Sequence, residues 1–493
     1  MIRPLAPFTA KLEDAAQLVG GFLHGSNISF TGLTHVDTDV EPGDLFIAIP
    51  GARVHGATFI EAAKKRGAVA VITDEDGLAY CDGIPAMTVT DVRSAGALLA
   101  ASFYKYPTRD LESIGITGTN GKTTVATLLY QIFHAVGRDT GLIGTVETRV
   151  GADVLTSSRT TPEAPELQAL AAVMRERHMR HLVMEVSSHA LSLKRVKGSH
   201  FAIAAFTNLS QDHLDFHKDM NSYYEAKAQL FTSEYAEKAF INIDSDYGIR
   251  LSQEASIPLT TISRTNTTAT WHFVEIHSVT RGVEFSIRGT GGILIESRTR
   301  LFGGFNLDNL LLALAIAVEC GIDPMELAAI TPTLTGAPGR LESISLGQHY
   351  TALVDYAHSP DAVTSVLSAT QEFTRGRVIA ILGCGGDRDA SKRPLMGQAL
   401  VHGADIAIFT SDNPRSESPR EILAQMTHSL SITAPSQIIE DRADAIRAAV
   451  ALAQDGDTVI VLGKGHESGQ EVAGAITPFD DRIVLAEAIE AKP

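Results

Sequence analysis

The sequence predicts an α/β protein of three domains with a nucleotide-binding domain at its centre. Three observations lead to this prediction. A chain of 493 residues is too long for one hydrophobic core. Short apolar runs alternate with helical patterns along most of it, as in parallel sheets covered by helices. One glycine-rich stretch, Gly115–Thr124 (GITGTNGKTT), matches the phosphate-loop pattern G-x-x-x-x-G-K-[ST].

This stretch predicts that the protein binds a nucleoside triphosphate. An apolar run with Ile114 and Ile116 precedes it, and Val125–Val136 has a helical pattern. In that context backbone N–H groups and a helix N-terminus surround phosphate oxygens. Lys122 reaches the β- and γ-phosphates, and the Thr123 hydroxyl is an Mg²⁺ ligand. The alternative is an ordinary glycine-rich turn. The expected ATP contacts in the loop are Gly118, Thr119, Asn120, Gly121, Lys122, Thr123 and Thr124.

The composition is that of a soluble globular protein, with 44% hydrophobic and 20% charged residues. The formal net charge of −17 argues against nucleic-acid binding, because phosphate contacts need clustered lysine and arginine. The three cysteines, Cys81, Cys320 and Cys384, lack CxxC spacing, so we expect neither a zinc site nor a disulfide framework.

The amino-terminal segment Met1–Ala10 contains two prolines and no apolar core, so we expect no secretory signal. The longest apolar run, Leu310–Val318, is about half a membrane span. We therefore expect a cytoplasmic protein without membrane insertion.

Residues 1–107 are expected to form the first α/β domain. Thr34–Gly51 concentrates turn residues around a strand, and it either lines a ligand pocket or is a structural turn. Tyr106–Thr108 is the expected linker. Predicted strands are Leu45–Ile49 and Ala68–Thr73, and predicted helices are Phe59–Lys65 and Val92–Tyr104.

Residues 108–336 are expected to form the central domain around the phosphate loop. The predicted strands His181–Glu185 and Phe201–Asn208 each end in a polar cluster, where open α/β sheets bind their ligands. Residues 270–302 alternate between apolar and polar side chains with glycine-rich turns, which predicts antiparallel hairpins. Asn306–Cys320 is a predicted buried helix that stops at Gly321.

Four residues of this domain are candidates for the site. Glu185 could complete an Mg²⁺ shell, because Mg²⁺ prefers oxygen ligands, or it could be a turn or capping residue. His189 and His213 each follow a strand end. Lys227 falls on the predicted helix Ser222–Phe231 and, taken alone, would be a surface lysine.

Residues 337–493 are expected to form a third, Rossmann-like domain, a parallel sheet with helices on both faces. Predicted strands are Tyr350–Asp355, Val378–Leu382, Ile406–Thr410 and Thr458–Leu462, and polar clusters follow at Asp355–His358, Gly383–Arg388, Asp412–Arg415 and Gly463–Glu467. Arg388 and Arg415 suit carboxylates, and Glu467 suits an ammonium group, so together they fit an amino acid. Surface salt bridges are the alternative for each of them.

Together these motifs resemble the Mur ligase family of ATP-dependent amide-forming ligases, over essentially the whole chain. The resembling stretches occur in the family's order: Gly115–Thr124, Glu185–His189 (EVSSH), Thr207–His213 (TNLSQDH), Phe305–Asn309 (FNLDN), Gly339–Glu342 (GRLE), Asp355–His358 (DYAH) and Gly463–Glu467 (GKGHE). Within the family the chain resembles the MurE type, which adds the third residue of the stem peptide. Asp412–Arg415 (DNPR) matches the pattern associated with meso-diaminopimelate.

The resemblance implies an ATP-dependent reaction in peptidoglycan precursor synthesis. ATP would phosphorylate the terminal carboxylate of UDP-N-acetylmuramoyl-L-alanyl-D-glutamate, and the amine of diaminopimelate would attack the acyl phosphate. It also implies a carbamylated Lys227 that helps to hold a second Mg²⁺, with metal-site roles for Glu185 and His213. The implied ATP contacts in the later part of the chain are Asn306, Asn309, Arg340 and Asp355.

The resemblance assigns two further sets of substrate contacts. The set for the uridine-nucleotide substrate is Thr38, Thr160, Thr161, Ser187 and Arg195. The set for diaminopimelate is Arg388, Asp412, Asn413, Pro414, Arg415, Gly463 and Glu467. The uridine-binding segment usually reads D-S-R-x-V-x-P-G-D-L-F, whereas here Thr38 replaces the serine and Asp39 the arginine. Leu193 stands where some members carry glutamine.

Three alternatives to the implied function stay open at this point. The ligase could use L-lysine in place of diaminopimelate, or it could be a folylpolyglutamate synthetase-like enzyme. It could also be a phosphate-loop protein that binds ATP as a switch without ligase chemistry. We expect small-molecule substrates and a monomer.

Overall fold

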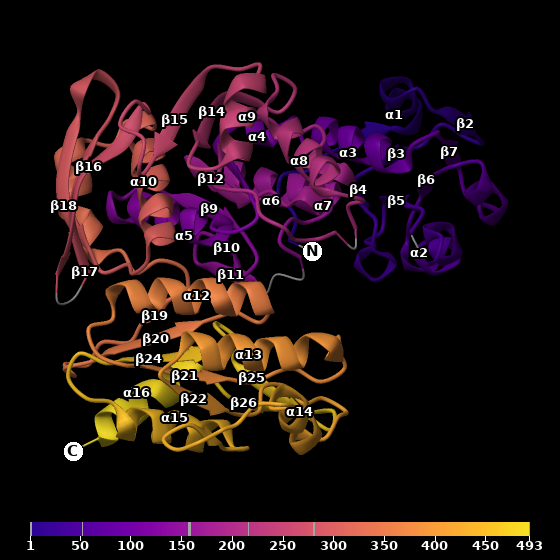
Figure 1. The fold of residues 1–493 in the computed structure, drawn as a ribbon. Coiled ribbons are helices and arrows are strands. Elements are labelled where there is room, and N and C mark those ends of the chain that lie inside the picture. Colours follow the sequence, from indigo (N-terminus) through magenta and orange to yellow (C-terminus); the bar gives the residue numbers. More distant parts are fainter. Residues whose placement is uncertain (1, 52, 156–158, 215, 280–281, 493) are drawn as a thin grey trace. The chain divides into compact units, whose positions relative to one another are not determined.

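A computed structural model describes residues 2–51, 53–155, 159–214, 216–279 and 282–492 of the chain (Figure 1). The chain divides into two compact units: Met1–Phe273, Arg288–Ile293 and Leu311–Asp323 form the first, and Val274–Ile287, Leu294–Leu310 and Pro324–Pro493 form the second. Both are mixed α/β structures, which confirms the predicted fold class. The three predicted domain ranges stay a prediction. Within the described ranges, no helix combines the length and the apolarity needed to cross a membrane.

A five-stranded sheet in the order β2-β7-β6-β5-β4 begins the first unit. It is parallel except for the antiparallel pair β2–β7. Ile47, Ile72 and Met87 of three of its strands are fully buried and pack on α3. The predicted strands and helices of this region are confirmed. The elements are β1 (Ala10–Lys11), α1 (Leu12–Val19), β2 (Phe22–His24), β3 (Ser29–Phe30), β4 (Gly32–Thr34), β5 (Asp44–Ile47), α2 (Ile60–Arg66), β6 (Ala70–Thr73), β7 (Ala86–Thr88) and α3 (Val92–Phe103).

The predicted linker Tyr106–Thr108 is not an open connection. A short helix, α4 (Pro107–Asp110), begins at the proline, whose fixed φ suits the first helical position. Thr108 is buried, and its hydroxyl accepts a hydrogen bond from the backbone N–H of His200 at 3.1 Å.

The second sheet of the first unit carries the phosphate loop. Its strand order includes β11-β10-β9-β12-β8-β13-β14-β15, and β16 pairs with β15. From β9 to β15 all the neighbours are parallel. The strands are β8 (Glu112–Thr117), β9 (Thr140–Ile143), β10 (Thr148–Val150), β11 (Asp153–Leu155), β12 (His181–Glu185), β13 (Phe201–Phe206), β14 (Ala236–Asn242), β15 (Leu259–Ser263) and β16 (Trp271–Val279).

Because β8 lies between β12 and β13, the carboxyl ends of these three strands meet at one edge of the sheet. The loops that follow them at Thr117, Glu185 and Phe206 therefore come together, as the polar clusters predicted. The helices of this part are α5 (Lys122–Ala135), α6 (Ala164–Glu176), α7 (Ser188–Ser192), α8 (Met220–Ala228) and α9 (Asp246–Glu254).

Helix α5 begins three residues before the predicted start at Val125. Gly121, with φ +90°, ends the loop, and the helix starts at Lys122. The apolar periodicity that predicted the helix begins only at Val125, because the first turn presents polar side chains to the loop.

Most of the hairpin region and the carboxyl-terminal sheet belong to the second unit, and the helix that follows the hairpins passes into the first unit at Leu311. Strands β17 (Gly282–Arg288) and β18 (Leu294–Thr299) are neighbours joined by residues 289–293, and so short a connection allows only an antiparallel pair. The predicted buried helix is α10 (Gly304–Glu319), followed by Gly321 at φ +77°. The next helix is α11 (Pro324–Ile330).

The carboxyl-terminal sheet has the order β19-β20-β24-β21-β22-β23 and is parallel except for the pair β19–β20. Alternate residues of its central strands point to opposite faces. Ala380 and Leu382 of β21 pack on one apolar cluster, and Ile379 and Ile381 pack on another. Helices α12 and α13 cover the first face, and α15 and α16 the second (Figure 1). The predicted parallel sheet with helices on both faces is confirmed.

The elements of this sheet and its helices are β19 (Glu342–Ser343), β20 (Thr351–Asp355), α12 (Pro360–Phe373), β21 (Val378–Leu382), α13 (Arg393–Gly403), β22 (Ile406–Phe409), α14 (Pro419–Met426), β23 (Gln437–Ile438), α15 (Arg442–Leu452), β24 (Thr458–Leu462), β25 (Gly469–Val472), β26 (Ala475–Pro478) and α16 (Asp481–Ala491).

Candidate active site

The phosphate loop connects β8 to the amino terminus of α5. Gly118 has φ +149°, and a Cβ atom at this position would lie 1.9 Å from Thr207 Oγ1, so only glycine fits there. Lys122 Nζ donates hydrogen bonds to the carbonyl oxygens of Gly118 at 3.0 Å and Thr119 at 2.8 Å. The side chain is thus folded over the loop, where it can turn toward phosphate oxygens.

Glu185, at the end of β12, lies against the first turn of α5. Its side chain is almost fully buried, and Oε2 accepts a hydrogen bond from Thr123 Oγ1 at 3.0 Å. The backbone N–H of Thr145 donates to Oε1 at 2.7 Å. A hydroxyl and a carboxylate meet here beside a triphosphate loop, and both are oxygen ligands that suit Mg²⁺.

Lys227, on α8, is a buried lysine and not a surface residue. Only 1% of it is exposed, and Nζ donates a hydrogen bond to the carbonyl oxygen of Gly118 at 2.7 Å. Nζ also lies 4.6 Å from the centre of the Tyr223 ring. Burial, with the nearby Lys122 charge, lowers its pKa well below the ordinary value, while Asp212 partly opposes this shift. The amine can therefore be uncharged and nucleophilic.

His213 lies on the exposed loop after β13, with φ +53°. Its ring packs edge-on against His189 at 4.8 Å between centroids and lies 6.1 Å from the ring of Tyr223. Tyr223 in turn hydrogen-bonds Thr119 at 3.1 Å. A chain of contacts therefore links both histidines to the phosphate loop.

Thr160, Thr161, Ser187 and Arg195 gather beside Glu185. Thr161 Oγ1 donates to the carbonyl oxygen of Glu185 at 2.9 Å and accepts from the Ser187 N–H at 3.1 Å. Arg195 Nη1 donates to the carbonyl oxygen of Thr161 at 3.3 Å. Thr160 accepts a hydrogen bond from the side chain of Thr145, the residue that also holds Glu185.

Sequence reasoning missed two residues of this cluster, Glu163 and Arg93. Glu163 is buried and accepts from Arg195 Nε and from Arg93 Nη1, each at 3.0 Å. Arg93 is on α3, so this pair joins the amino-terminal sheet region to the phosphate-loop region within the first unit. The proline-flanked run of Thr160, Thr161 and Glu163 was the available signal, since it precedes α6 directly.

Thr38 is exposed on the single 3₁₀ turn Asp37–Asp39. Arg3 Nη2 donates to the carbonyl oxygen of Asp39 at 2.9 Å, and the same guanidinium pairs with Asp44 at 2.6 Å. The turn is therefore anchored from the amino-terminal segment. Next to it, the pKa of His35 is lowered by burial and by the charges of Arg159 and Arg93, against the charge of Glu163.

The other four residues assigned to ATP lie in the second unit. Asn306 and Asn309 are buried one turn apart on α10, where Asn306 Nδ2 donates to the carbonyl oxygen of Phe302 at 2.9 Å. Asp355 accepts from the N–H of Leu341, and the guanidinium of Arg340 lies over the ring of Tyr356. Burial raises the pKa of Asp355, and the Arg340 charge opposes this rise.

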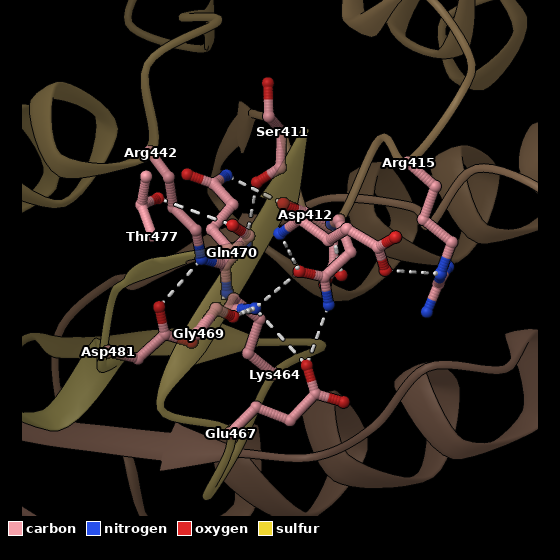
Figure 2. Close-up of polar contacts among 12 residues, drawn as sticks. Ser411, Asp412, Arg415, Arg442, Lys464, Glu467, Gly469, Gln470, Thr477 and Asp481 are labelled. Carbon is pink, nitrogen blue, oxygen red and sulfur yellow. Dashed lines mark hydrogen bonds and ion pairs between the residues drawn. The ribbon is translucent and has the colours of Figure 1, made fainter. Parts of the chain in front are cut away.

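The assigned amino-acid contacts that follow β22 and β24 lie together at the carboxyl ends of these strands, where Figure 2 shows Asp412 and Glu467. Asn413 Nδ2 donates to Glu467 Oε2 at 2.8 Å. Lys464 is fully buried, and its Nζ donates to Asn413 Oδ1 at 3.1 Å and to Glu467 Oε2 at 3.3 Å. Gly463 has φ +112°, and a Cβ there would lie 2.7 Å from Asp412 Oδ2.

Arg415 is held in the left-handed region at φ +52°. Its Nη1 donates to the carbonyl oxygen of Gly386 at 2.7 Å, and its Nε lies 3.5 Å from Glu471 Oε2. A Cβ on Gly386 would lie 1.9 Å from the Pro414 carbonyl oxygen, so the loops after β21 and β22 are in close contact. Arg388 is exposed on the first of these loops.

A buried ion pair beside this cluster fixes two of the strand ends (Figure 2). Arg442 and Asp481 pair at 2.7 Å with both side chains fully buried. Arg442 also donates to the carbonyl oxygens of Ser411 and Leu462, the residues that directly precede Asp412 and Gly463. Sequence reasoning missed Lys464 and Arg442. In the sequence, the available signal for Lys464 was its position between two glycines, Gly463 and Gly465. In the structure both glycines have positive φ.

Comparison with known proteins gives matches along the whole chain. Three family models match: "Mur ligase family, catalytic domain" over residues 30–104, "Mur ligase middle domain" over residues 116–317 and "Mur ligase, glutamate ligase domain" over residues 339–465. The chain is 48% identical to the UDP-N-acetylmuramoyl-L-alanyl-D-glutamate--2,6-diaminopimelate ligase of Streptomyces coelicolor, over 99% of this chain and 98% of that protein. The ligase of the same name from Streptomyces avermitilis is also 48% identical, with the same coverage. A solved structure of a ligase with this name has a TM-score of 0.70 and 34% identity and covers 94% of this chain and 95% of its own.

Proposed function

Because the chain belongs to the Mur ligase family, we propose that it adds meso-diaminopimelate to UDP-N-acetylmuramoyl-L-alanyl-D-glutamate, with ATP, in peptidoglycan precursor synthesis. The observation that carries this proposal is the full-length similarity to ligases named for that reaction. The enzyme acts on small molecules, and we expect it to do so as a cytoplasmic monomer.

The reaction first makes the carboxylate reactive. A carboxylate oxygen of the D-glutamyl residue attacks the γ-phosphorus of ATP, the bond to the β–γ bridging oxygen breaks, and ADP leaves. Lys122 and the N–H groups of the phosphate loop hold the phosphates while two anions approach each other. Thr123, Glu185 and His213 would hold Mg²⁺, which supplies charge neutralisation when it is bound. The 3.0 Å contact between Thr123 and Glu185 supports the first two of these ligands.

The second step forms the amide bond. The amine of diaminopimelate attacks the carbonyl carbon of the acyl phosphate, the tetrahedral intermediate expels phosphate, and the nitrogen loses a proton. In our proposal, Glu467 and Asn413 receive the ammonium end of diaminopimelate, and Arg388 and Arg415 receive its distal carboxylate. The mutual contacts of Asn413 and Glu467 support a preformed pocket.

Lys227 is proposed to be carbamylated. An uncharged Nζ attacks CO₂ and loses a proton, which gives an anionic carbamate with two oxygen ligands for a second Mg²⁺. The burial of Lys227 and its lowered pKa support this step, because only the neutral amine reacts.

The uridine-nucleotide substrate is proposed to contact Thr38, Thr160, Thr161, Ser187 and Arg195. Asp39 replaces the arginine of the usual segment, so cationic contacts to the diphosphate must come from elsewhere. Arg3 contacts this turn but is paired with Asp44. Arg93, Arg159 and Arg195, which lie close enough to His35 or Glu163 to interact with them electrostatically, are therefore the proposed cationic contacts.

An isotope experiment tests the acyl phosphate route. With ¹⁸O in the D-glutamyl carboxylate, each turnover should transfer one ¹⁸O atom to the released phosphate and leave ADP unlabelled. The product should be the nucleotide-linked tripeptide with one added diaminopimelate by mass spectrometry. Phosphate without label would refute the acyl phosphate, and a product with lysine would replace the proposed amino acid.

A further inference from the structure

Glu112, His181 and Cys320 gather in the first unit at the edge of the sheet opposite the phosphate loop. One ligand atom from each lies within 4.8 Å of the other two. Glu112 begins β8 and His181 begins β12, and the two residues are partners in the parallel pairing of these strands. The phosphate loop follows the other end of β8, six residues away, or roughly 20 Å along a strand. The cluster is therefore separate from the ATP site.

His181 gives the observation that points to a ligand. Its side chain is fully buried, and neither ring nitrogen has a hydrogen-bond partner within the described parts of the chain. The ring stacks on Phe133 at 4.0 Å with an interplanar angle of 6°, which fixes its plane. Glu112 Oε2 lies 3.0 Å from Nδ1, but outside hydrogen-bond geometry. Buried polar atoms in proteins nearly always have a partner, so a bound group is expected here.

The donor atoms indicate which class of ligand fits. A thiol, an imidazole and a carboxylate are the three side-chain types that bind Zn²⁺, and a thiolate disfavours Mg²⁺ and Ca²⁺. The negative charges of the thiolate and the carboxylate together neutralise the 2+ charge of the cation. A water molecule can serve as the fourth ligand and complete a tetrahedral site. We propose that Glu112, His181 and Cys320 form a binding site for Zn²⁺ or a similar thiophilic divalent cation. On binding, the Cys320 thiol releases its proton to solvent.

Two arginines next to the cluster define how the metal would be held. Arg180 donates to Glu112 Oε1 at 3.2 Å and more weakly to Oε2 at 3.4 Å, so Oε2, which faces His181, is the oxygen available to a metal. Arg138 donates to the carbonyl oxygens of Cys320 and Gly321 at 2.6 and 2.9 Å. These contacts fix the backbone that carries the thiol. The positive charges of both arginines repel a cation and so limit the affinity of the site for the metal.

Cobalt spectroscopy tests the proposal directly. Full-length protein is treated with a chelator and titrated with Co²⁺ in excess Mg²⁺. We expect one equivalent of Co²⁺ to produce a thiolate-to-cobalt charge-transfer band and the strong visible bands of a tetrahedral site, and Zn²⁺ to abolish both. The band distinguishes this site from the ATP site, because none of the residues proposed to bind Mg²⁺ is a cysteine. Absence of the band in the wild-type protein would overturn the proposal.

Variants assign the band to this cluster. Cys320→Ser should lose it and bind Zn²⁺ at least about 10-fold more weakly, whereas Cys81→Ser should retain both properties. Glu112→Gln changes a partly exposed side chain and should keep the band but weaken Zn²⁺ binding by a similar factor. This variant tests the site if Cys320→Ser does not fold. A band that survives in Cys320→Ser, or unchanged affinity in Glu112→Gln, would refute the site.

Discussion

The Thr123 hydroxyl donates a hydrogen bond to Glu185 Oε2 at 3.0 Å, although the two residues are 62 positions apart. The contact exists because β8 and β12 are parallel neighbours, so the loop after one strand meets the last residue of the other. It places a hydroxyl and a carboxylate together beside the phosphate loop. Substitution of Thr123 therefore tests the proposed Mg²⁺ site.

Thr123→Ala should lower kcat by about 10²–10³-fold, because it removes an oxygen that stabilises the transferring phosphoryl group through Mg²⁺. The Mg²⁺ concentration for half-maximal phosphate release should rise at the same time. Thr123→Ser is the matched control, since it keeps the hydroxyl and should stay within a few-fold of wild type. Equal losses in both variants would mean that the threonine methyl group, not the oxygen, is needed.

Lys227→Ala should lose most of its activity, because the alanine variant cannot form the carbamate. Short carboxylic acids such as acetate or propionate should partly restore phosphate release by supplying the missing anionic oxygens, while bicarbonate should not. Activity is measured over a range of acid concentrations, with the Lys227→Met variant as a bulkier control that should be rescued less. Full activity in Lys227→Ala would rule out the carbamate role.

The lowered pKa of Lys227 also predicts a pH dependence of stability. In the unfolded chain this lysine titrates near 10.5, so between its folded-state pKa and 10.5 the unfolded protein binds more protons. The free energy of unfolding therefore rises with pH in this window, by up to about 1.4 kcal/mol per pH unit, and falls as the pH is lowered. Lys227→Met lacks this contribution. Urea unfolding in CO₂-free buffer should show wild type gaining stability over the variant as the pH rises toward 10.5. A constant difference would contradict the shift.

Arg415→Ala should raise the KM for diaminopimelate by about 10-fold or more, with little change in the KM for ATP, because a charged hydrogen bond is worth about 1.5–3 kcal/mol. Arg420→Ala is a suitable control, since Arg420 is an exposed arginine of α14 that pairs with Glu440 and is not among the residues assigned to diaminopimelate. Similar increases in both KM values for Arg415→Ala would show that the loop has a structural role only.

The sequence predicted the strands well where they are fully buried. The bounds of β12, β21 and β24 agree with the predicted ranges, because strands buried on both faces are uninterrupted apolar runs that end in polar clusters. The start of α5 was missed by three residues, since its first turn serves the loop and carries no apolar periodicity.

Side-chain partners were harder to predict than strands. Lys464 is fully buried, whereas lysines are almost always exposed, so its position between Asn413 and Glu467 could not be read from residue type. Glu163 and Arg93 are 70 residues apart and pair only because α3 packs on α6. Such contacts depend on how distant elements pack, which no local pattern encodes.

The most direct test of the proposed reaction is ATP-dependent phosphate release with UDP-N-acetylmuramoyl-L-alanyl-D-glutamate and meso-diaminopimelate, with L-lysine, or with no amino acid. We predict release only with diaminopimelate. Preferred use of lysine would keep the ligase but refute the assignment of Arg415 and its loop. Release that needs no amino acid, or none with either amino acid, would contradict the proposed function.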